Sequence, residues 1–325
     1  MKILVTGGAG YIGSIVSAML VDAGHSVVAI DDLSTSDASG VPAGVEFIRC
    51  DISQVATVLT PDSGFDAVLH FAGLIAAGES VQKPGLYWHV NTGGSLSLLV
   101  AMRAAGVRKI VFSSSAAVYG NPTQVPILES ATVAPTSPYG ENKLAVDFML
   151  AGEVAALGIA ATSLRYFNVV GAYRRGTTVM GERHTPETHL IPLALEAAAG
   201  RRPEFAIFGT DYPTPDGTTI RDYIHVEDLA RAHLLALDNL TPGEHKVFNL
   251  GNGTGFSIRE VLAVVEKVTG KPLPVIEKDR RAGDPAELVA SSDAAKAELG
   301  WTPAKASLQD MVSDAWDFLN SGSQS

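Results

Sequence analysis

Short apolar runs alternate with segments of helical periodicity along the first half of the chain. A short apolar run fits a buried strand, whereas apolar positions that recur every three or four residues fit a helix packed on a sheet. The predicted strands are Ile3–Val5, Val27–Ile30, Val45–Ile48, Ala67–Phe71 and Ile110–Phe112. The predicted helices are Ser14–Ala23, Leu86–Ala105 and Pro138–Leu157. This alternation predicts right-handed crossovers and an α/β fold, a doubly wound parallel sheet with helices on both faces.

The second half of the chain adds two predicted strands and two segments of different composition. Ile159–Arg165 and Val247–Leu250 are expected to extend the same sheet. Gly171–Ile220 and Gly253–Ser325 are rich in Pro, Gly, Arg and His, and we expect them to form a smaller domain that is discontinuous in sequence. The expected division is a larger domain of residues 1–168 and 221–251 and a smaller, substrate-binding domain of residues 169–220 and 252–325.

Composition narrows the partners of such a protein. The chain has 325 residues, 46% of them hydrophobic, which suffices for a large core. Its net charge of -11 disfavours binding to nucleic acid or to an anionic membrane. A single cysteine, Cys50, excludes an internal disulfide framework and a cysteine-rich metal site and fits a reducing cytosol. No apolar stretch suits a signal peptide or a membrane span, so we expect a cytoplasmic protein.

A glycine-rich segment, TGGAGYIG, follows the first predicted strand and opens the first predicted helix. Gly7, Gly10 and Gly13 stand where a tight turn, close approach of a pyrophosphate and helix-on-sheet packing each exclude a Cβ atom. The free amides of that helix then face phosphate. Asp31 ends the second strand, where it would bind ribose hydroxyls and repel a 2′-phosphate, so NAD is favoured over NADP. The alternative is a plain connecting turn, and the position of Asp31 argues against it.

Serines follow the fifth predicted strand, and PYGENK places Tyr139 and Lys143 four residues apart. On a helix that spacing puts both side chains on one face. A tyrosine needs a nearby positive charge to act as a base at neutral pH, and Lys143 and an oxidised nicotinamide would each supply one. Ser115 would hold the substrate hydroxyl within reach. Alone, this spacing is a common accident; after the serines and the glycine-rich segment, it predicts a proton-transfer site.

These segments give the chain a resemblance to a known family. From Met1 to about Phe318 the chain resembles the extended short-chain dehydrogenase/reductase superfamily, and within it the UDP-glucose 4-epimerases. The segments that carry the resemblance are GGAGYIG, SSSAAVYG, SPYGENK, LRYFNVVGA, THLIP, AIFGTDYPTPDGTTIRDYIHVED and RRAGDP. It implies a Rossmann-type NAD domain beside a UDP-sugar domain. It also implies an isomerase that interconverts UDP-galactose and UDP-glucose by transient NAD-mediated oxidation at carbon 4.

The resemblance assigns a role to individual residues. Tyr139 would be the base, Lys143 its partner and a ligand of the nicotinamide ribose, and Ser115 the group that positions the hydroxyl. The residues expected to contact the cofactor are Gly7, Gly10, Tyr11, Ile12, Gly13, Asp31, Asp32, Leu33, Ser34, Asp51, Ile52, Phe71, Ala72, Gly73, Asn91, Ser113, Tyr139, Lys143 and Phe167. The residues expected to contact the UDP-sugar are Ser115, Tyr139, Asn168, His189, Leu190, Ala206, Phe208, Arg221, Arg281, Asp284 and Leu288. Arg221 and Arg281 would clamp the diphosphate, because guanidinium groups bind phosphate oxygens in pairs.

Two positions depart from the pattern of many relatives. Ile75 stands where a lysine often lies near the cofactor phosphates, so retention of NAD must depend on other contacts. Leu288 stands where some relatives have a tyrosine beside the hexose, which leaves the preferred sugar open among UDP-hexoses, UDP-N-acetylhexosamines and UDP-pentoses. Relatives are commonly dimers through a helix bundle. The apolar positions Leu96, Leu99, Val100 and Leu144 permit a homodimer, although core packing explains them equally well.

No metal site is expected from the histidines. The segment from His184 to His189 offers two imidazoles and Glu187, but Pro186 breaks the helical spacing that a zinc site of this kind needs.

Two rival functions remain. One is another nucleotide-sugar epimerase or a 4,6-dehydratase of the same superfamily. Relatives of the dehydratase kind have an Asp-Glu pair after the catalytic hydroxyl residue, whereas Ala116 and Ala117 follow Ser115 here. The other is a non-catalytic NAD-sensing regulator, which would have no need of Ser115, Tyr139 and Lys143 together.

Overall fold

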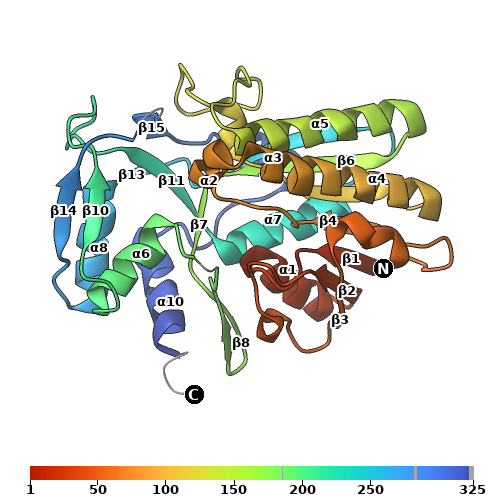
Figure 1. Ribbon diagram of the computed structural model, residues 1–325, viewed down its shortest axis with the longest axis horizontal. Coiled ribbons are helices and arrows are strands. Elements are labelled where there is room, and N and C mark those ends of the chain that lie inside the picture. The colour runs from red at the N-terminus through yellow and green to blue at the C-terminus, as the bar shows by residue number, and fades with distance from the viewer. Residues whose placement is uncertain (185, 282–283, 322–325) are drawn as a thin grey trace.

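A seven-stranded sheet in the order β12-β6-β5-β4-β1-β2-β3 is the centre of the larger lobe (Figure 1). The computed structural model describes residues 1–184, 186–281 and 284–321. All neighbouring strands run parallel, as the sequence predicts. The strands are β1 (Lys2–Thr6), β2 (Ser26–Asp31), β3 (Glu46–Arg49), β4 (Ala67–His70), β5 (Lys109–Ser113), β6 (Ala160–Tyr166) and β12 (His245–Leu250). Each of the predicted strands is therefore present, with small differences at its ends.

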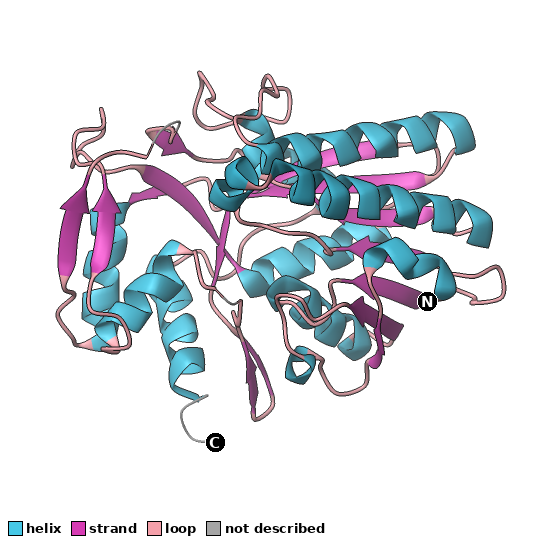
Figure 2. Ribbon diagram, in the orientation of Figure 1, coloured by secondary structure: helices cyan, strands magenta, loops and turns pink. Residues whose placement is uncertain are grey.

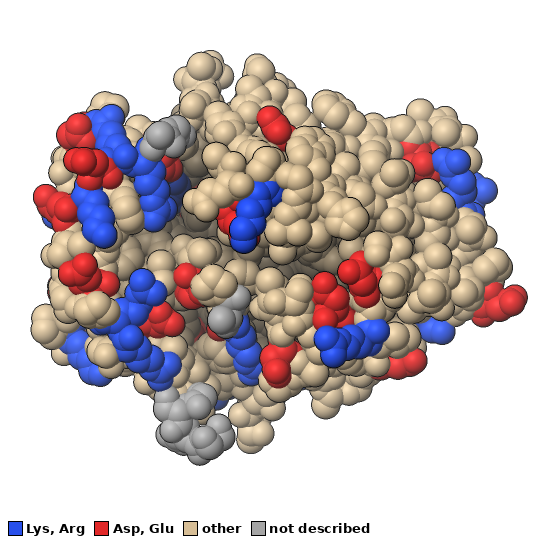
Figure 3. Space-filling model, in the orientation of Figure 1, with Lys and Arg blue, Asp and Glu red and all other residues tan. Residues whose placement is uncertain are grey.

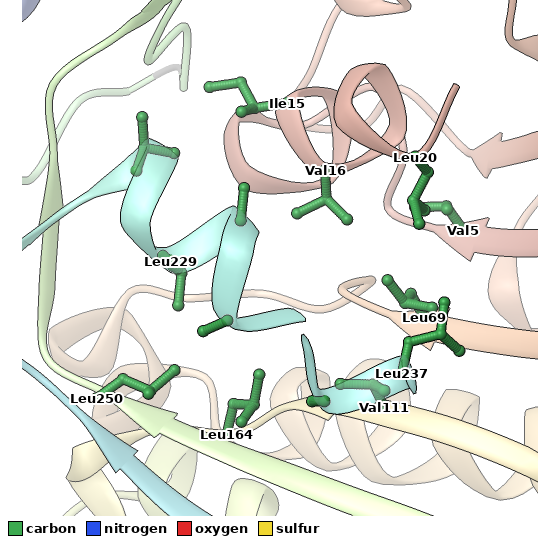
Figure 4. Packing of buried hydrophobic residues seen from close by; sticks show 14 of the residues in the cluster. Val5, Ile15, Val16, Leu20, Leu69, Val111, Leu164, Leu229, Leu237 and Leu250 are labelled. Atoms are coloured by element: carbon green, nitrogen blue, oxygen red, sulfur yellow. The ribbon is translucent and has the colours of Figure 1, made fainter. Parts of the chain in front are cut away.

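Helices cover both faces of this sheet, because successive strand residues point to opposite sides. Ile3 and Val5 face one side, where α1 (Tyr11–Asp22) and α7 (Val226–Asp238) pack. Figure 4 shows this layer, in which Val16 and Leu229 approach the side chains of the strands. Leu4 faces the other side, against α4 (Gly94–Ala105), α5 (Pro138–Leu157) and the short helix η2 (Ile52–Thr57).

The predicted helix Leu86–Ala105 is interrupted in the structure. Its first part is α3 (Pro84–Tyr87), its middle the π-helical turn η3 (Trp88–Gly93), and its last part α4. A π-turn inserts an extra residue into the helical repeat and is common at functional positions. A further short helix, α2 (Ala77–Gln82), precedes it. No helix within the described ranges has the length and apolar character needed to cross a membrane.

The smaller lobe contains short sheets covered by helices (Figure 2). Its strands are β7 (Asn168–Val170), β8 (Tyr173–Arg175), β9 (Thr178–Met180), β10 (Phe205–Phe208), β11 (Ile220–His225), β13 (Gly255–Ser257), β14 (Val275–Lys278) and β15 (Glu287–Leu288). Its helices are α6 (Leu190–Ala198), α8 (Ile258–Thr269) and α10 (Leu308–Ser321), which share one apolar core, while α9 (Asp293–Leu299) packs beside β12. Ala282 and Gly283, within the RRAGDP segment, lie outside the described residues.

Strand β11 links the two lobes. It pairs with β7, β13 and β15 in the smaller lobe, and the chain then returns to the larger lobe through α7 and β12. The expected domain boundary placed most of this strand with the larger domain. The division at residues 168, 220 and 251 stays a prediction.

Candidate active site

A cavity of about 350 Å³ lies where the carboxyl ends of the main-sheet strands meet the smaller lobe. This is the edge of a parallel sheet at which ligands bind. Figure 3 shows a hollow in the surface between the two lobes. The cavity is lined by 19 residues that the sequence analysis selected: Gly7, Gly10, Tyr11, Ile12, Gly13, Asp31, Asp32, Ser34, Ile52, Phe71, Ala72, Gly73, Ser113, Ser115, Tyr139, Lys143, Phe167, Asn168 and His189.

The glycine-rich turn lies at one end of the cavity. Gly7 has a φ of +71°, and a Cβ atom there would come within 2.7 Å of the amide nitrogen of Ala72. A Cβ atom on Gly13 would collide with the carbonyl oxygen of Gly7. No side chain caps the start of α1, so the amides of its first turn are left for another acceptor beside the cavity. This arrangement fits a pyrophosphate at the helix N-terminus.

Asp31 both shapes the neighbouring loop and faces the cavity. One carboxylate oxygen accepts a hydrogen bond from the amide of Ala9 at 3.1 Å. The other accepts from the amide of Leu33 at 2.9 Å and from the hydroxyl of Ser36 at 2.8 Å. The oxygen that accepts only from Ala9 has further acceptor capacity, so the residue can still bind a ribose hydroxyl. Its position fits the role expected for it.

Three of the expected cofactor ligands, Leu33, Asp51 and Asn91, are not among the residues that line the cavity. The side chain of Asn91 brackets Leu74 by accepting from its amide at 2.8 Å and donating to its carbonyl oxygen at 2.9 Å. Asn91 therefore holds the loop after β4 from behind. Asp51 caps η2 through the amide of Ser53. Their direct contact with a cofactor stays a prediction.

Two helix starts bring the proton-transfer residues together. Ser137 caps α5 through the amide of Gly140, and Tyr139 and Lys143 then follow one turn apart. Ser115 is the N-cap of the short helix η4 (Ala116–Tyr119), where its hydroxyl accepts from the amide of Ala117 at 3.1 Å. Lys143 Nζ lies 5.8 Å from the centre of the Tyr139 ring. The trio predicted from the sequence thus meets in one cavity.

Burial controls the protonation of these groups. It raises the pKa of Tyr139, and a hydrogen bond with Ser115 opposes the rise. It lowers the pKa of Lys143 to about 8, and the negative charge of Asp147 opposes the fall. The protein groups alone therefore keep the phenol of Tyr139 protonated. The positive charge of an oxidised nicotinamide beside it is the contribution that would favour the phenolate.

Residues expected to bind the substrate form a second group in the smaller lobe. Arg221 on β11 pairs with Asp284 at 2.6 Å. The guanidinium of Arg281 lies 3.9 Å from the centre of the Phe208 ring on β10. Asn168 lines the cavity and donates to the carbonyl oxygen of Asp222 at 3.0 Å.

Several expected substrate residues are not among those that line the cavity: Arg221, Arg281, Phe208, Asp284, Leu190, Ala206 and Leu288. Leu288 packs in a cluster with Phe167 and Tyr119. Leu190 and Ala206 belong to α6 and β10.

The sequence analysis missed an acidic group on the wall of the cavity. Glu182 lines it, and Glu182, Glu187 and His189 bring ligand atoms within 4.8 Å of one another. Burial lowers the pKa of His189, but its hydrogen bond to Glu187 and the charge of Glu182 outweigh this effect and raise it. The segment was set aside because Pro186 breaks a helix, but Glu182, Glu187 and His189 lie outside any helix in the structure, so helical spacing does not decide whether they can meet. His189 is hydrogen-bonded to Glu187 and lies 3.8 Å from a carboxylate oxygen of Glu182. The expectation of no metal stays a prediction.

The fold and this site define a class of protein, a dinucleotide-binding α/β enzyme with a Tyr-Lys proton-transfer pair. The model of the NAD dependent epimerase/dehydratase family matches residues 3–251, and the chain belongs to this family.

Named relatives and solved structures agree with this placement. The chain is 55% identical to the UDP-glucose 4-epimerase of Streptomyces lividans, over 98% of this chain and 96% of that one. It is similar to the crystal structure of the Brucella ovis UDP-glucose 4-epimerase in complex with NAD, with a TM-score of 0.93, 43% identity and coverage of 98% of each chain. It is also similar to the UDP-Glc/GlcNAc 4-epimerase of Campylobacter jejuni, with a TM-score of 0.85, 38% identity and coverage of 98% of this chain and 99% of that one.

Proposed function

We propose that this protein is an NAD-dependent isomerase that interconverts UDP-galactose and UDP-glucose by inverting carbon 4 of the hexose. The observation that carries the proposal is the meeting of Ser115, Tyr139 and Lys143 with the glycine-rich turn in one cavity. Relatives named UDP-glucose 4-epimerase match over nearly the whole chain, which supports the choice of substrate. Arg221 and Arg281 supply the cations that a diphosphate needs in a protein of net charge -11.

The residues of this chain divide the work of the reaction. Bound between the glycine-rich turn and Tyr139, NAD would supply reversible hydride acceptance from carbon 4 of the sugar. Tyr139 takes the proton of the 4-hydroxyl at its phenol oxygen and gives it back in the second half of the reaction. Ser115 orients that hydroxyl, and the ammonium of Lys143 stabilises the phenolate. Contacts with the UDP group hold the 4-keto sugar while it turns over.

Two alternatives lose support at the same site. A 4,6-dehydratase needs an acid and a base to eliminate water, but Ala116 and Ala117 follow Ser115 and offer neither. A non-catalytic NAD sensor would have no need to bury Lys143 beside Tyr139, because burying a charged ammonium is unfavourable.

The sugar pocket is proposed to accept UDP-N-acetylhexosamines as well as UDP-hexoses. Leu288 is a smaller residue than the tyrosine of some relatives, so it leaves room beside the carbon 2 substituent. The Campylobacter jejuni relative is named for both UDP-Glc and UDP-GlcNAc, which supports this extension. Removal of a steric wall permits a substrate without excluding the smaller one.

The protein is also proposed to be a cytoplasmic homodimer. Helices α4 and α5 lie side by side on the outside of the larger lobe (Figure 1). Leu96 and Val100 on α4 are 53% and 60% exposed, and Phe148 on α5 is 64% exposed. Such a cluster of large exposed apolar side chains fits a face covered by a second copy. Leu99 is 4% exposed and belongs to the core instead.

One incubation tests the proposed reaction. The purified protein is mixed with UDP-galactose without any added reductant, and the sugar nucleotides are separated and quantified. We expect UDP-glucose to form until the two reach equilibrium, with no net oxidation. The absence of UDP-glucose, or the appearance of a 4-keto-6-deoxy product, would refute the proposal. The cofactor released on denaturation is expected to be NAD, and the finding of NADP would refute the role of Asp31.

A further inference from the structure

A buried ion pair lies directly behind the proton-transfer residues. Asp147 on α5 and Arg165 on β6 have side chains only 4% and 7% exposed. One carboxylate oxygen of Asp147 accepts from Nε of Arg165 at 3.1 Å and from Nη2 at 2.8 Å. The other carboxylate oxygen is buried, and it has no hydrogen-bond partner within the described part of the chain. The proposed reaction does not use either residue directly.

The pair is connected to both elements that bear catalytic groups. Tyr139, Lys143 and Asp147 follow one another at intervals of four on α5, so they share one face of the helix. Nη1 of Arg165 donates to the hydroxyl of Tyr119 at 3.0 Å. Tyr119 is the last residue of η4, and Ser115 is the N-cap of the same short helix. The ion pair therefore joins the helix of Tyr139 to the turn of Ser115.

The connection continues into β12 and the loop beyond η4. The hydroxyl of Tyr119 donates to the side-chain oxygen of Asn249 at 2.7 Å. The amide group of Asn249 donates to the carbonyl oxygen of Ile127 at 3.0 Å. Tyr119 is 1% exposed and Asn249 is fully buried, so water does not loosen these bonds. Four elements of the larger lobe are thereby held in register behind the cavity.

Stability alone does not account for such a pair. Removing two charges from water is unfavourable, and replacement of a buried ion pair by apolar residues of similar size is often neutral or stabilising. Loss of one partner leaves a buried charge and is strongly unfavourable. Asp147 lies four residues from Lys143 on α5, so the pair is placed where it can act on the geometry and charge of the active site.

We propose that Asp147 and Arg165 are positioning residues, which fix the Ser115 turn against the helix of Tyr139 and hold the carboxylate of Asp147 one helical turn from Lys143. This inference rests on the proposed roles of Tyr139 and Lys143.

Among the described residues, Asp147 is the source of negative charge that acts on Lys143. On its own helix Lys143 faces Tyr139 and Asp147. From β4 it is approached by His70, whose pKa is lowered to about 3 by burial and by Lys143 itself, so this imidazole is neutral. From β5 come the carbonyl oxygen of Ser113, at 2.8 Å, and the ring of Phe112.

Strand β6 supplies the remaining groups, Arg165 and Tyr166. Burial raises the pKa of Tyr166, so this phenol is neutral. Arg165 is positive and lies beyond Asp147, to which it is bonded. Asp147 raises the pKa of Lys143 against the effect of burial, so its neutralisation is expected to let Lys143 lose its proton at lower pH.

The test compares the alkaline limb of the pH profile of kcat for wild type and three variants, each as the intact chain with bound NAD. Asp147→Asn leaves only the positive charge, Arg165→Met leaves only the negative charge, and the double variant leaves neither. We expect the limb to lie at the lowest pH in Asp147→Asn, higher in the double variant, higher again in wild type, and highest in Arg165→Met. The shift between the extremes should be on the order of one pH unit. The double variant leaves no unpaired buried charge, so it keeps the test possible if a single variant fails to fold.

A second variant isolates positioning from charge. Tyr119→Phe removes the hydroxyl that joins Arg165 to Asn249 but keeps the ring and every charge. We expect kcat to fall about tenfold, with KM and the alkaline limb unchanged, because a loosened catalytic geometry slows turnover. Glu153→Gln is the matched control. It neutralises another carboxylate of α5, which pairs with the exposed Arg103, and it should leave kcat, KM and the alkaline limb unchanged.

Three results separate the possible failures. Alkaline limbs that coincide in all variants, with melting temperatures changed, would reduce the pair to a structural role and overturn the charge argument. An unchanged kcat in Tyr119→Phe would overturn the positioning argument. Retained activity in Tyr139→Phe would instead refute the proposed function on which both arguments depend.

Discussion

Tyr139 shows how a side chain of ordinary chemistry is adapted to its site. Burial by itself raises the pKa of its phenol, which opposes its use as a base. The hydrogen bond with Ser115 acts in the opposite direction, and the amine of Lys143 lies 5.8 Å from the centre of the ring. The base is therefore activated only when all the groups around the substrate are assembled, which restricts proton transfer to the loaded site.

The first prediction at this scale concerns Tyr139→Phe. Loss of the phenol oxygen removes the proton acceptor, so we expect turnover to fall by about a thousandfold or more while NAD stays bound. Steady-state rates with UDP-galactose and the NAD content of the purified protein are the measurements. Tyr173→Phe, which changes a tyrosine of β8 outside the cavity, should behave as wild type. Turnover near the wild-type rate in Tyr139→Phe would contradict the assignment.

The second concerns Leu288. We expect the unmodified protein to epimerise UDP-N-acetylglucosamine measurably, and Leu288→Tyr to lose this activity while it largely keeps the UDP-galactose reaction. The ratio of kcat/KM for the two substrates is the measurement, and Leu288→Met is the control of similar size. If wild type turns over UDP-galactose well but ignores the N-acetylated sugar, a neighbouring side chain fills the space and the proposal is wrong.

At the scale of elements, the starts of helices fix the site. Ser137 begins α5 and so sets where Tyr139 and Lys143 project, and Ser115 begins η4. In the smaller lobe, Ser257 begins α8 with a capping box. Its hydroxyl accepts from the backbone amide of Glu260, and the carboxylate of Glu260 accepts from the backbone amide of Ser257. Caps of this kind satisfy amides that the helix itself leaves unpaired.

We predict that Ser257→Ala lowers the free energy of unfolding by about 1 kcal/mol, because it removes the N-cap of α8. It also takes the hydroxyl of Ser257 from its short contact with Asp216. Denaturant unfolding followed by circular dichroism measures the effect. Ser257→Thr keeps a hydroxyl cap and should lie between wild type and the alanine variant. Equal stability of all three proteins would show that the cap contributes nothing.

At the scale of the whole molecule, buried ionisable groups link stability to pH. Burial lowers the pKa of His70 to about 3 and that of His233 to about 4, from 6.5. Unfolding lets both take up protons below pH 6.5, so they make the fold less stable as the pH falls. Asp222 acts in the opposite direction, since burial raises its pKa to about 6 and the folded state binds its proton first.

Replacing one of these histidines isolates its contribution to the pH dependence of stability. We predict that the free energy of unfolding of wild type, measured by denaturant unfolding, falls more steeply between pH 6.5 and 4 than that of His233→Leu. The expected difference in slope is about 1.4 kcal/mol per pH unit, the value for one proton. His89→Gln changes an exposed histidine and should leave the slope as it is in wild type. Parallel curves for wild type and His233→Leu would show that His233 does not titrate in this way.

The proposed dimer makes a prediction at the same scale. The mass in solution should be twice that of the 34.0 kDa chain. Leu96→Glu combined with Val100→Glu should give a monomer, because four charges would be buried between the paired helices of two copies. Light scattering after gel filtration measures the mass, and Leu128→Glu, at an exposed position outside α4 and α5, is the control. A wild-type monomer would contradict the proposal outright.

The sequence by itself determined the features that depend on neighbours in the chain. Alternating apolar runs predicted the parallel sheet, since strand and helix have different periods. The spacing of Tyr139 and Lys143 placed them on one helix face. Gly7 and Gly13 marked a turn that has no room for a Cβ atom at either position. Each of these inferences needs only local geometry.

Tertiary structure alone decided the rest, because the contacts join residues far apart in the chain. Arg165 meets Asp147 and Tyr119 only because β6, α5 and η4 pack together. Glu182, Glu187 and His189 come together outside any helix or strand, so no hydrophobic period indicates the group. Strand β11 links the two lobes because it pairs with β7, β13 and β15, and no pattern within its own residues indicates those partners. Pairing and burial depend on which surfaces meet, and a one-dimensional pattern does not contain that information.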